Sequence, residues 1–113
     1  MNPLLVTAGL TAVLALAVGP AAAAPRDLSV GVTLKDHRFT PAVIKVPAGA
    51  KVRIDLSNLD PATEEFDSHD LKVEQLVTPH GRTSFTIGPL KPGAYSFMGE
   101  FHPTTAQGRV DAG

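Results

Sequence analysis

The sequence predicts a single antiparallel β-sandwich, and three features of the chain lead to this fold class. Short segments in which apolar and polar residues alternate recur along the chain after residue 25. Gly, Pro, Asn and Asp separate these segments, and none shows the longer period of an amphipathic helix. The 113 residues leave room for one domain. Several short strands at regular spacing indicate two packed sheets.

Residues 1–24 are expected to be a signal peptide that precedes the domain at residues 25–113. Residues 1–25 contain no Lys, Arg, Asp or Glu, and an apolar run over residues 4–18 is followed by Gly19, Pro20 and four alanines. This order is typical of a secretory signal peptide. The alternative is an uncleaved membrane anchor, because residues 4–24 approach the length of about 20 apolar residues that a spanning helix needs.

Seven segments of the remaining chain are predicted to be strands. Each places apolar side chains on one face and polar side chains on the other, or forms a short apolar run. They are residues 30–34, 43–46, 52–56, 71–74, 84–87, 95–98 and a short piece around residues 109–110. Residues 59–68 are polar and acidic, and they are predicted to be an ordered loop or a single helical turn.

Proline and glycine mark the turns between these strands. Residues 79–81 and 91–93 each combine a proline, which presets φ, with a glycine, which supplies positive φ. Pro92, Gly93 and Tyr95 are typical of the tyrosine corner of Greek-key sandwiches, in which the hydroxyl group bonds to nearby backbone.

The composition limits both the source of stability and the class of partner. The chain has no cysteine, so the core must stabilise the domain without disulfides. Lys and Arg number 10 against 11 Asp and Glu, for a net charge of −1. This balance does not indicate a nucleic acid or an anionic membrane as partner. No catalytic triad or phosphate-binding loop stands in a suitable context.

Three stretches of the chain resemble the cupredoxins. The first resembles their Phe-x-Pro, Val-x-x-Gly and Val opening, the second their segment that ends in the first histidine ligand, and the third their last strands and ligand loop. The matching residues are Phe39, Pro41, Val46, Gly49 and Val52; then Asn58, Asp60, His69 and Leu71; then Pro92, Gly93, Tyr95, Phe97, His102 and Gly108. The resemblance implies a cupredoxin-like Greek-key β-sandwich of about seven strands.

The resemblance also implies that no blue-copper centre forms. Counted from Tyr95, the cysteine position of the family falls on Gly99, the second histidine position on His102, and the axial position near Ala106 or Gln107. A blue-copper site needs the short bond from a cysteine sulfur, which this chain lacks.

A more particular resemblance is to the cupredoxin-like domains of bacterial ferrous-iron uptake systems of the Efe and Ftr type. It rests on Glu64, Glu65 and Phe66, on His69, Asp70 and Leu71, and on residues 99–102. It implies a periplasmic accessory protein that binds iron or copper beside an inner-membrane iron permease and other periplasmic iron-uptake components.

His69 and His102 are the first candidate metal ligands. His69 shares its parity with Leu71 and Val73, so it is expected to face inward at the start of a strand. His102 lies in the loop that supplies a ligand in the family. Neutral imidazole is the commonest metal ligand in proteins, but a backbone-bonded His69 and an exposed His102 are the structural alternatives.

Carboxylates near these histidines are the next candidates, because two imidazoles and a carboxylate suit non-haem iron. Glu65 is the first choice, since residues 65, 67 and 69 share one direction in an extended chain. Glu100 reaches a metal only if the chain turns after Gly99. Further candidates are Glu64, Asp67, Met98 and His37, each of which also fits a simple surface position.

These residues leave three functions open. The first is a metal-binding accessory protein for iron uptake. The second is a ferroxidase that uses bound copper or iron, because a site of nitrogen and carboxylate ligands with an open position supports oxygen chemistry. The third is a metal-free sandwich that serves as a protein-interaction module, which the missing cysteine favours.

Overall fold

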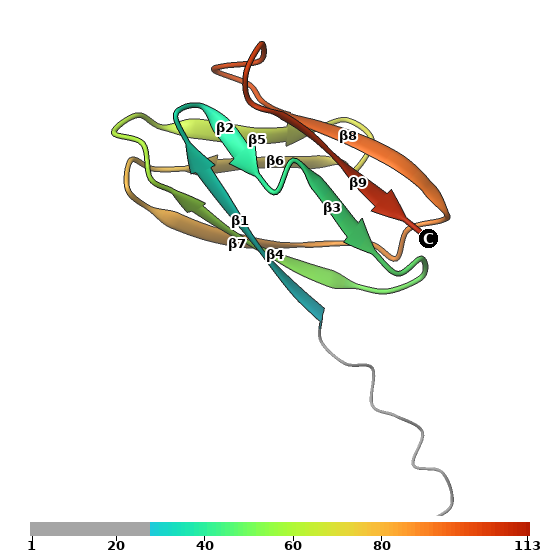
Figure 1. Cartoon of the computed structure of the whole chain (residues 1–113). Helices are drawn as coiled ribbons and strands as arrows, with labels where there is room; N and C mark the ends of the chain where they lie inside the picture. The colour runs from blue at the N-terminus through green and yellow to red at the C-terminus, as the bar shows by residue number, and fades with distance from the viewer. Residues whose placement is uncertain (1–27) are drawn as a thin grey trace, which may run out of the picture.

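The computed structural model describes residues 28–113, which form a β-sandwich of two sheets (Figure 1). The strands are β1 (Leu28–Lys35), β2 (Arg38–Thr40), β3 (Val43–Val46), β4 (Val52–Asn58), β5 (Glu64–Ser68), β6 (Val73–Val77), β7 (Arg82–Ile87), β8 (Gly93–Gly99) and β9 (Gln107–Ala112). One sheet has the order β2-β1-β4-β7, and the other has the order β3-β9-β8-β5-β6. The expected signal peptide lies outside the described residues. Within them, no helix is long and apolar enough to cross a membrane.

The predicted sandwich is confirmed, with nine strands in place of about seven. Most neighbouring strands are antiparallel, but β1 pairs with β4 in parallel and β3 pairs with β9 in parallel. Both parallel pairs bring an early strand beside a later one, as the arrows in Figure 1 show. The sheets therefore depart from a purely antiparallel arrangement at these two places.

The segment expected to be a loop contains β5. Its inward positions are Glu64, Phe66 and Ser68, all buried, while Glu65 and Asp67 are only partly buried. Two of the three inward residues are polar, so the usual apolar signal of a strand is absent from the sequence. The prediction of a loop or helical turn for residues 64–68 was wrong for that reason.

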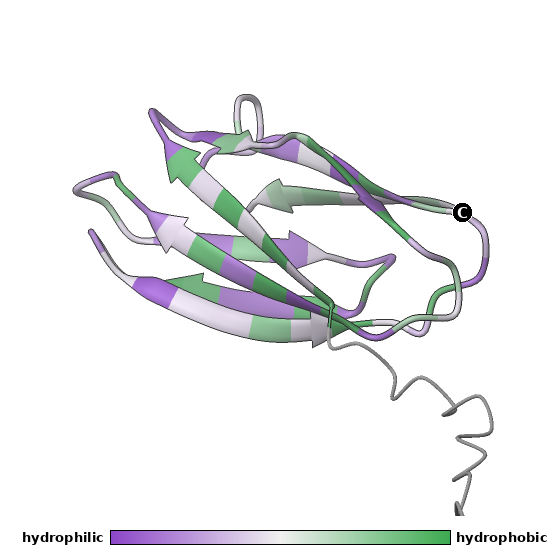
Figure 2. Ribbon diagram, turned by 60° about the horizontal axis from the view of Figure 1, so that its bottom comes forward, coloured by the Kyte–Doolittle hydropathy of each residue, from purple (hydrophilic) through white to green (hydrophobic). Residues whose placement is uncertain are grey.

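Apolar side chains from both sheets form one core between them. Hydrophobic and hydrophilic residues alternate along the strands, as the colours in Figure 2 show. An aromatic cluster lies at the centre, where the Phe66 ring stacks on Phe97 with centroids 4.6 Å apart. Phe39 meets the Phe97 ring edge-on at 5.3 Å. Contacts of this kind add to the stability that apolar burial provides.

The tyrosine corner predicted at Tyr95 is confirmed. Its hydroxyl group donates a hydrogen bond of 2.7 Å to the carbonyl oxygen of Lys91, in the turn that leads into β8.

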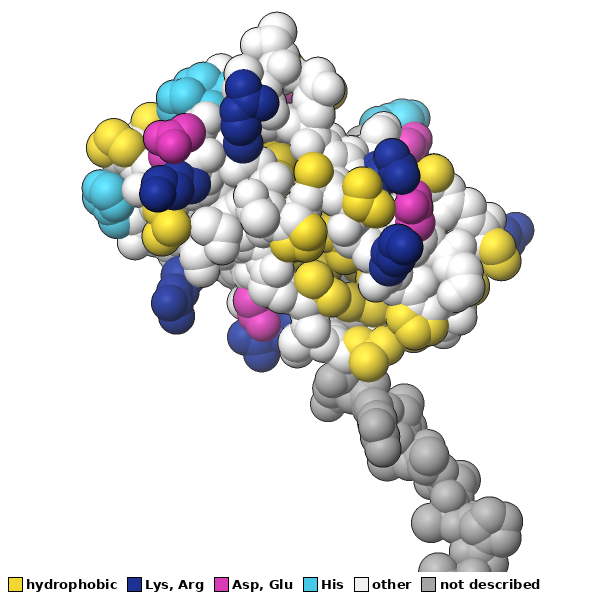
Figure 3. All heavy atoms as spheres, viewed as in Figure 1, with side chains coloured by type: hydrophobic (Ala, Val, Ile, Leu, Met, Phe, Trp, Pro, Cys, Tyr) yellow, Lys and Arg dark blue, Asp and Glu magenta, His cyan; other side chains and the backbone are white. Residues whose placement is uncertain are grey.

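The outer surface carries Lys and Arg interspersed with Asp and Glu over the face in Figure 3, and histidines lie near the ends of that face.

Candidate metal centre

Glu64 is a buried carboxylate at the first position of β5. Its side chain points into the sandwich because it shares the inward parity of Phe66, and the residue is only 1% exposed. Its Oε1 atom accepts hydrogen bonds from the N–H groups of Glu65 (3.0 Å) and Phe101 (2.9 Å). These bonds supply part of the solvation that a buried carboxylate loses on leaving water.

His102 is the third partner of this carboxylate. Its Nδ1 atom lies 2.6 Å from Oε2 of Glu64, and 31% of its side chain is exposed. A compact turn after β8 places it there: the His102 N–H donates to the Gly99 carbonyl, and the Ala106 N–H donates to the His102 carbonyl. The ring therefore lies between a buried carboxylate and the solvent.

Gly99 makes room for this arrangement. A Cβ atom at position 99 would lie 2.7 Å from Cδ of Glu64 and 2.7 Å from Cβ of Ala106, closer than such atoms approach each other. The resemblance assigns the cysteine position to Gly99. In this chain the Glu64 carboxyl group occupies the space that a side chain at that position would enter.

His37 reaches the same place from the turn between β1 and β2. Lys35 pairs with Arg38, so Asp36 and His37 form a two-residue hairpin turn, with φ of 51° and 56°. Positive φ at both central positions is what a type I′ turn requires. The His37 ring stacks on the His102 ring, with centroids 3.5 Å apart and planes 12° apart.

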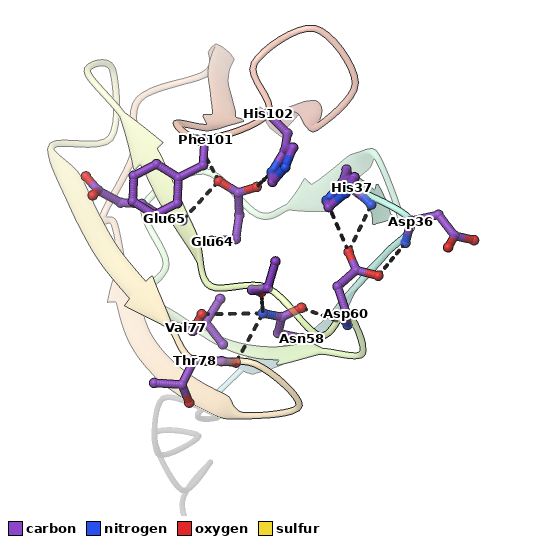
Figure 4. A network of polar contacts seen from close by, with 11 residues as sticks. Asp36, His37, Asn58, Asp60, Glu64, Glu65, Val77, Thr78, Phe101 and His102 are labelled. Carbon is purple, nitrogen blue, oxygen red and sulfur yellow. Dashed lines mark hydrogen bonds and ion pairs between the residues drawn. The ribbon is translucent and has the colours of Figure 1, made fainter.

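Asp60 lies on the other side of the His37 ring. Its Oδ1 atom accepts the N–H of Asp36 at 2.7 Å, and its Oδ2 atom accepts the N–H of His37 at 2.9 Å. Oδ2 also lies 3.5 Å from Nδ1 of His37. Figure 4 shows the two imidazole rings between the carboxylates of Glu64 and Asp60. Burial raises the pKa of Asp60, but the N–H groups of His37 and Asp36 bring that pKa below its usual value.

The side chains that converge are His37, Glu64 and His102. One ligand atom from each lies within 4.8 Å of the others. Three of the residues singled out in the sequence therefore meet at one end of the sandwich. Two imidazoles and one carboxylate form a donor set that suits iron, copper(II) or zinc, whereas copper(I) prefers thiolate and thioether sulfur. The residues thus fit a divalent ion.

Three other candidates, Glu65, Asp67 and Glu100, lie on the outer face of the second sheet near Glu74, which the sequence did not single out. Ligand atoms of Glu65, Asp67 and Glu74 lie within 4.8 Å of one another, and the Glu100 side chain approaches Asp67. The hydrogen bond and the charge of Asp67 raise the pKa of Glu100, and the charges of Glu65 and Glu74 raise it further. Glu65 and Glu100 therefore face this outer cluster, away from buried Glu64.

His69 and Met98 are also outside the His37–Glu64–His102 group. His69 is exposed in the turn after β5, at the end of that strand opposite Glu64. The expectation that it faces inward was wrong, because β6 begins only at Val73 and the parity of Leu71 and Val73 does not extend back to it. Met98 is 39% exposed on β8, opposite Asp67.

Asp60 was not among the candidates from the sequence, and Glu64 and His37, which lie beside His102, were only among the further candidates. The parity argument for Glu65 counted from His69, whereas Phe66 is the residue that fixes the inward face of β5. Phe66, an apolar residue between Glu65 and Asp67, was the sequence signal for the inward face of β5. The pair Asn58 and Asp60 was visible only as part of a family resemblance.

Comparison with known proteins gives a consistent family assignment. A family model described as a cupredoxin-like domain matches residues 7–110. The Rickettsia prowazekii (strain Madrid E) protein called uncharacterized protein RP394 is 44% identical over 92 residues, which are 81% of this chain and 74% of that protein.

Solved structures share the fold. The metal-binding domain of the Cu(I)-exporting P-type ATPase CopA of Streptococcus pneumoniae D39, with Cu(I), matches with a TM-score of 0.67 at 13% identity, over 75% of this chain and 84% of that chain. Auracyanin A, a blue copper protein of Chloroflexus aurantiacus, matches with a TM-score of 0.66 at 12% identity, over 77% of this chain and 99% of that chain. A purple cupredoxin of Nitrosopumilus maritimus matches with a TM-score of 0.57 at 17% identity, over 77% of this chain and all (100%) of that chain. Identities this low concern the fold alone.

Proposed function

Because this chain belongs to the cupredoxin-like domain family, we propose that it binds one divalent iron or copper ion through His37, Glu64 and His102. The observation that carries the proposal is the meeting of these three side chains, contributed by separate turns and strands, around one buried carboxylate. No blue-copper centre can form, because the chain has no cysteine to supply the thiolate.

Because the rings of His37 and His102 are stacked, one of them must turn when an ion binds. A metal ion lies close to the plane of an imidazole ligand, at about 2.0–2.1 Å from its nitrogen. Two nearly parallel rings at 3.5 Å cannot both meet this condition for one ion. The ring of His102 is held by its 2.6 Å contact with Glu64, whereas the His37 ring has a looser contact at 3.5 Å. His37 is therefore the ligand that turns.

The proposed role of the bound ion is cargo for uptake. A buried carboxylate together with two imidazoles supports a harder ion than copper(I), and the resemblance to ferrous-iron uptake domains supports iron. We propose an exported, periplasmic accessory protein that delivers the ion to an inner-membrane permease. The partial exposure of His102 supports access to the ion from solvent.

A titration of the full chain with Fe²⁺ without oxygen, Cu²⁺ and Zn²⁺ tests the binding proposal. We expect one ion per chain for the wild type and a loss of that binding in His37→Ala and His102→Ala. His69→Ala is the matched control and should bind as the wild type does. Equal binding by all four proteins would overturn the assigned ligands, and no binding by the wild type would leave a metal-free interaction module as the better account.

Deletion of the gene in its source cell tests the uptake role. We expect lower cellular iron when ferrous iron is scarce, with recovery on expression of the wild type but not of His102→Ala. A change in copper content instead would identify copper as the cargo. No change in either metal would contradict a role in uptake.

A further inference from the structure

The turn that carries His37 is fixed by a chain of buried polar contacts that begins far from it in the sequence. Asn58, at the end of β4, is 1% exposed, and its Nδ2 group donates to the carbonyl oxygens of Ala62 (2.8 Å) and Thr78 (3.1 Å). Its Oδ1 atom accepts the N–H of Asp60 at 2.9 Å. Asn58 thereby holds Asp60 in one place, as Figure 4 shows.

Asp60 in turn fixes the backbone of the turn that contains His37. It is 5% exposed, and its two oxygens accept the N–H groups of both residues in the positive-φ turn. Positive φ is unfavourable for residues other than glycine, so these two hydrogen bonds help to hold the turn in that conformation. The backbone of His37 is thus anchored, and only its side chain is left to turn.

We propose that Asp60 is a positioning residue that orients His37 as a metal ligand, an inference that rests on the function proposed above. The Oδ2 atom of Asp60 faces Nδ1 of His37 at 3.5 Å. A small turn of the ring makes Nδ1–H a donor to this carboxylate and leaves Nε2 as the free ligand atom. A carboxylate behind a metal-binding histidine fixes the ring tautomer and makes the imidazole a better donor.

The distribution of partners supports this division of roles. Glu64 uses only Oε1 for backbone N–H groups, so Oε2, beside His102, has no backbone donor and is available as a ligand atom. Asp60 uses both oxygens for the backbone of the His37 turn, and its contact with the His37 ring is on the side opposite the stacked His102 ring. Asp60 therefore acts through His37, while Glu64 faces the ion.

Nitrogen-15 NMR of the full-length chain, with the histidine rings neutral, tests the tautomer directly. We expect the wild-type His37 ring to carry its proton on Nδ1 and to show the shift of an unprotonated Nε2. In Asp60→Asn this preference should be lost, because one carboxylate oxygen becomes an amide group. A wild-type ring protonated on Nε2 would overturn the inference, even if the Asp60→Asn variant did not fold.

The affinity for Zn²⁺ provides the second measurement. We expect Asp60→Asn to bind about 10–100-fold more weakly than the wild type, as is typical for loss of such a partner. Asp70→Asn is the matched control, because Asp70 also accepts two hydrogen bonds, from the N–H and hydroxyl groups of Ser96, but outside the metal group. It should lose stability without losing affinity. Equal affinity of Asp60→Asn and the wild type would refute the role of Asp60, whereas no binding by the wild type would refute the metal site itself and leave the tautomer experiment decisive for Asp60.

Discussion

Nδ1 of His102 lies 2.6 Å from Oε2 of Glu64, and this contact joins a partly exposed ring to a carboxylate that is 1% exposed. The remaining oxygen of Glu64 is occupied by two backbone N–H groups. The pair brings an anion and an imidazole to the same point, and this combination suits iron, copper(II) or zinc.

Replacing this carboxylate should weaken metal binding. In Glu64→Gln, the amide oxygen can still accept the backbone N–H groups, but the anionic oxygen beside His102 is lost. We expect the affinity for Cu²⁺ to fall at least about tenfold, since partners of ligands alone contribute about 10–100-fold. Isothermal titration calorimetry measures the change. Glu65→Gln, on the outer face of the same strand, is the control, and equal losses in the two variants would contradict the assignment of Glu64.

Adding one methyl group at Gly99 should destabilise the domain. The new Cβ atom would meet Glu64 and Ala106 at 2.7 Å, so the neighbours must shift. Overpacking of this kind costs about 1–3 kcal/mol in the free energy of unfolding. Urea denaturation of Gly99→Ala tests this expectation, with Gly31→Ala as the control, because a Cβ at position 31 meets nothing within 4 Å. Equal stability of the two variants would show that position 99 is not crowded.

Neutralising Glu100 should stabilise the protein near neutral pH. Asp67 raises the pKa of Glu100, so the folded state holds this proton more tightly than the unfolded state does. The favourable contribution of the protonated form is complete below the unfolded pKa and is lost as pH rises through the higher folded pKa. Glu100→Gln keeps a neutral side chain at all pH values.

The prediction for Glu100→Gln is checked by urea denaturation at two pH values. The variant should be more stable than the wild type at about pH 7, and the difference should vanish near pH 3, where both side chains are neutral. Added salt should reduce the difference at neutral pH, because it screens surface charges. A difference that grows toward acid pH would show that the sign is wrong.

Truncating the central aromatic ring should lower the free energy of unfolding by more than the Gly99→Ala substitution does. Phe66 is 1% exposed and contacts the rings of Phe97 and Phe85, with centroids at 4.6 and 4.8 Å. We expect Phe66→Ala to lose about 3–5 kcal/mol of unfolding free energy. Phe101→Ala removes a ring that is 50% exposed and should change stability by about 0.5 kcal/mol or less. Chemical denaturation of both variants measures the contrast, and a small loss for Phe66→Ala would mean that the ring is not central to the core.

The sandwich could be predicted from the sequence because its core strands alternate apolar and polar residues. Val52, Ile54 and Leu56 are examples, and each of the three is 1% exposed. β5 was not predicted as a strand because Glu64 and Ser68 occupy inward positions that apolar residues normally fill. Inward polar residues have to be hydrogen-bonded by groups distant in the sequence, and a single sequence does not reveal those partners.

The candidate site could be predicted only in part for a related reason. His102 was chosen as a candidate from its place in the last loop. The residue on which its ring stacks, His37, lies 65 positions earlier in the sequence. The parallel pairing of β1 and β4 is what places the turn of His37 beside Asp60. Pairing between distant strands is not encoded in local alternation. Residues 65 and 67 do share one face of β5, but that face is the outer one, because Phe66 points inward and His69 lies beyond the end of the strand.

The close approach of Glu64 to Gly99 restricts the introduction of a cysteine ligand at position 99. A cysteine introduced by Gly99→Cys alone would meet a carboxyl group that already has its own partners, so its sulfur has no free space beside Glu64. The exchange of an oxygen donor for a sulfur donor therefore demands coordinated replacement at both positions. A smaller side chain at position 64 is therefore the condition for a thiolate at position 99 in this chain.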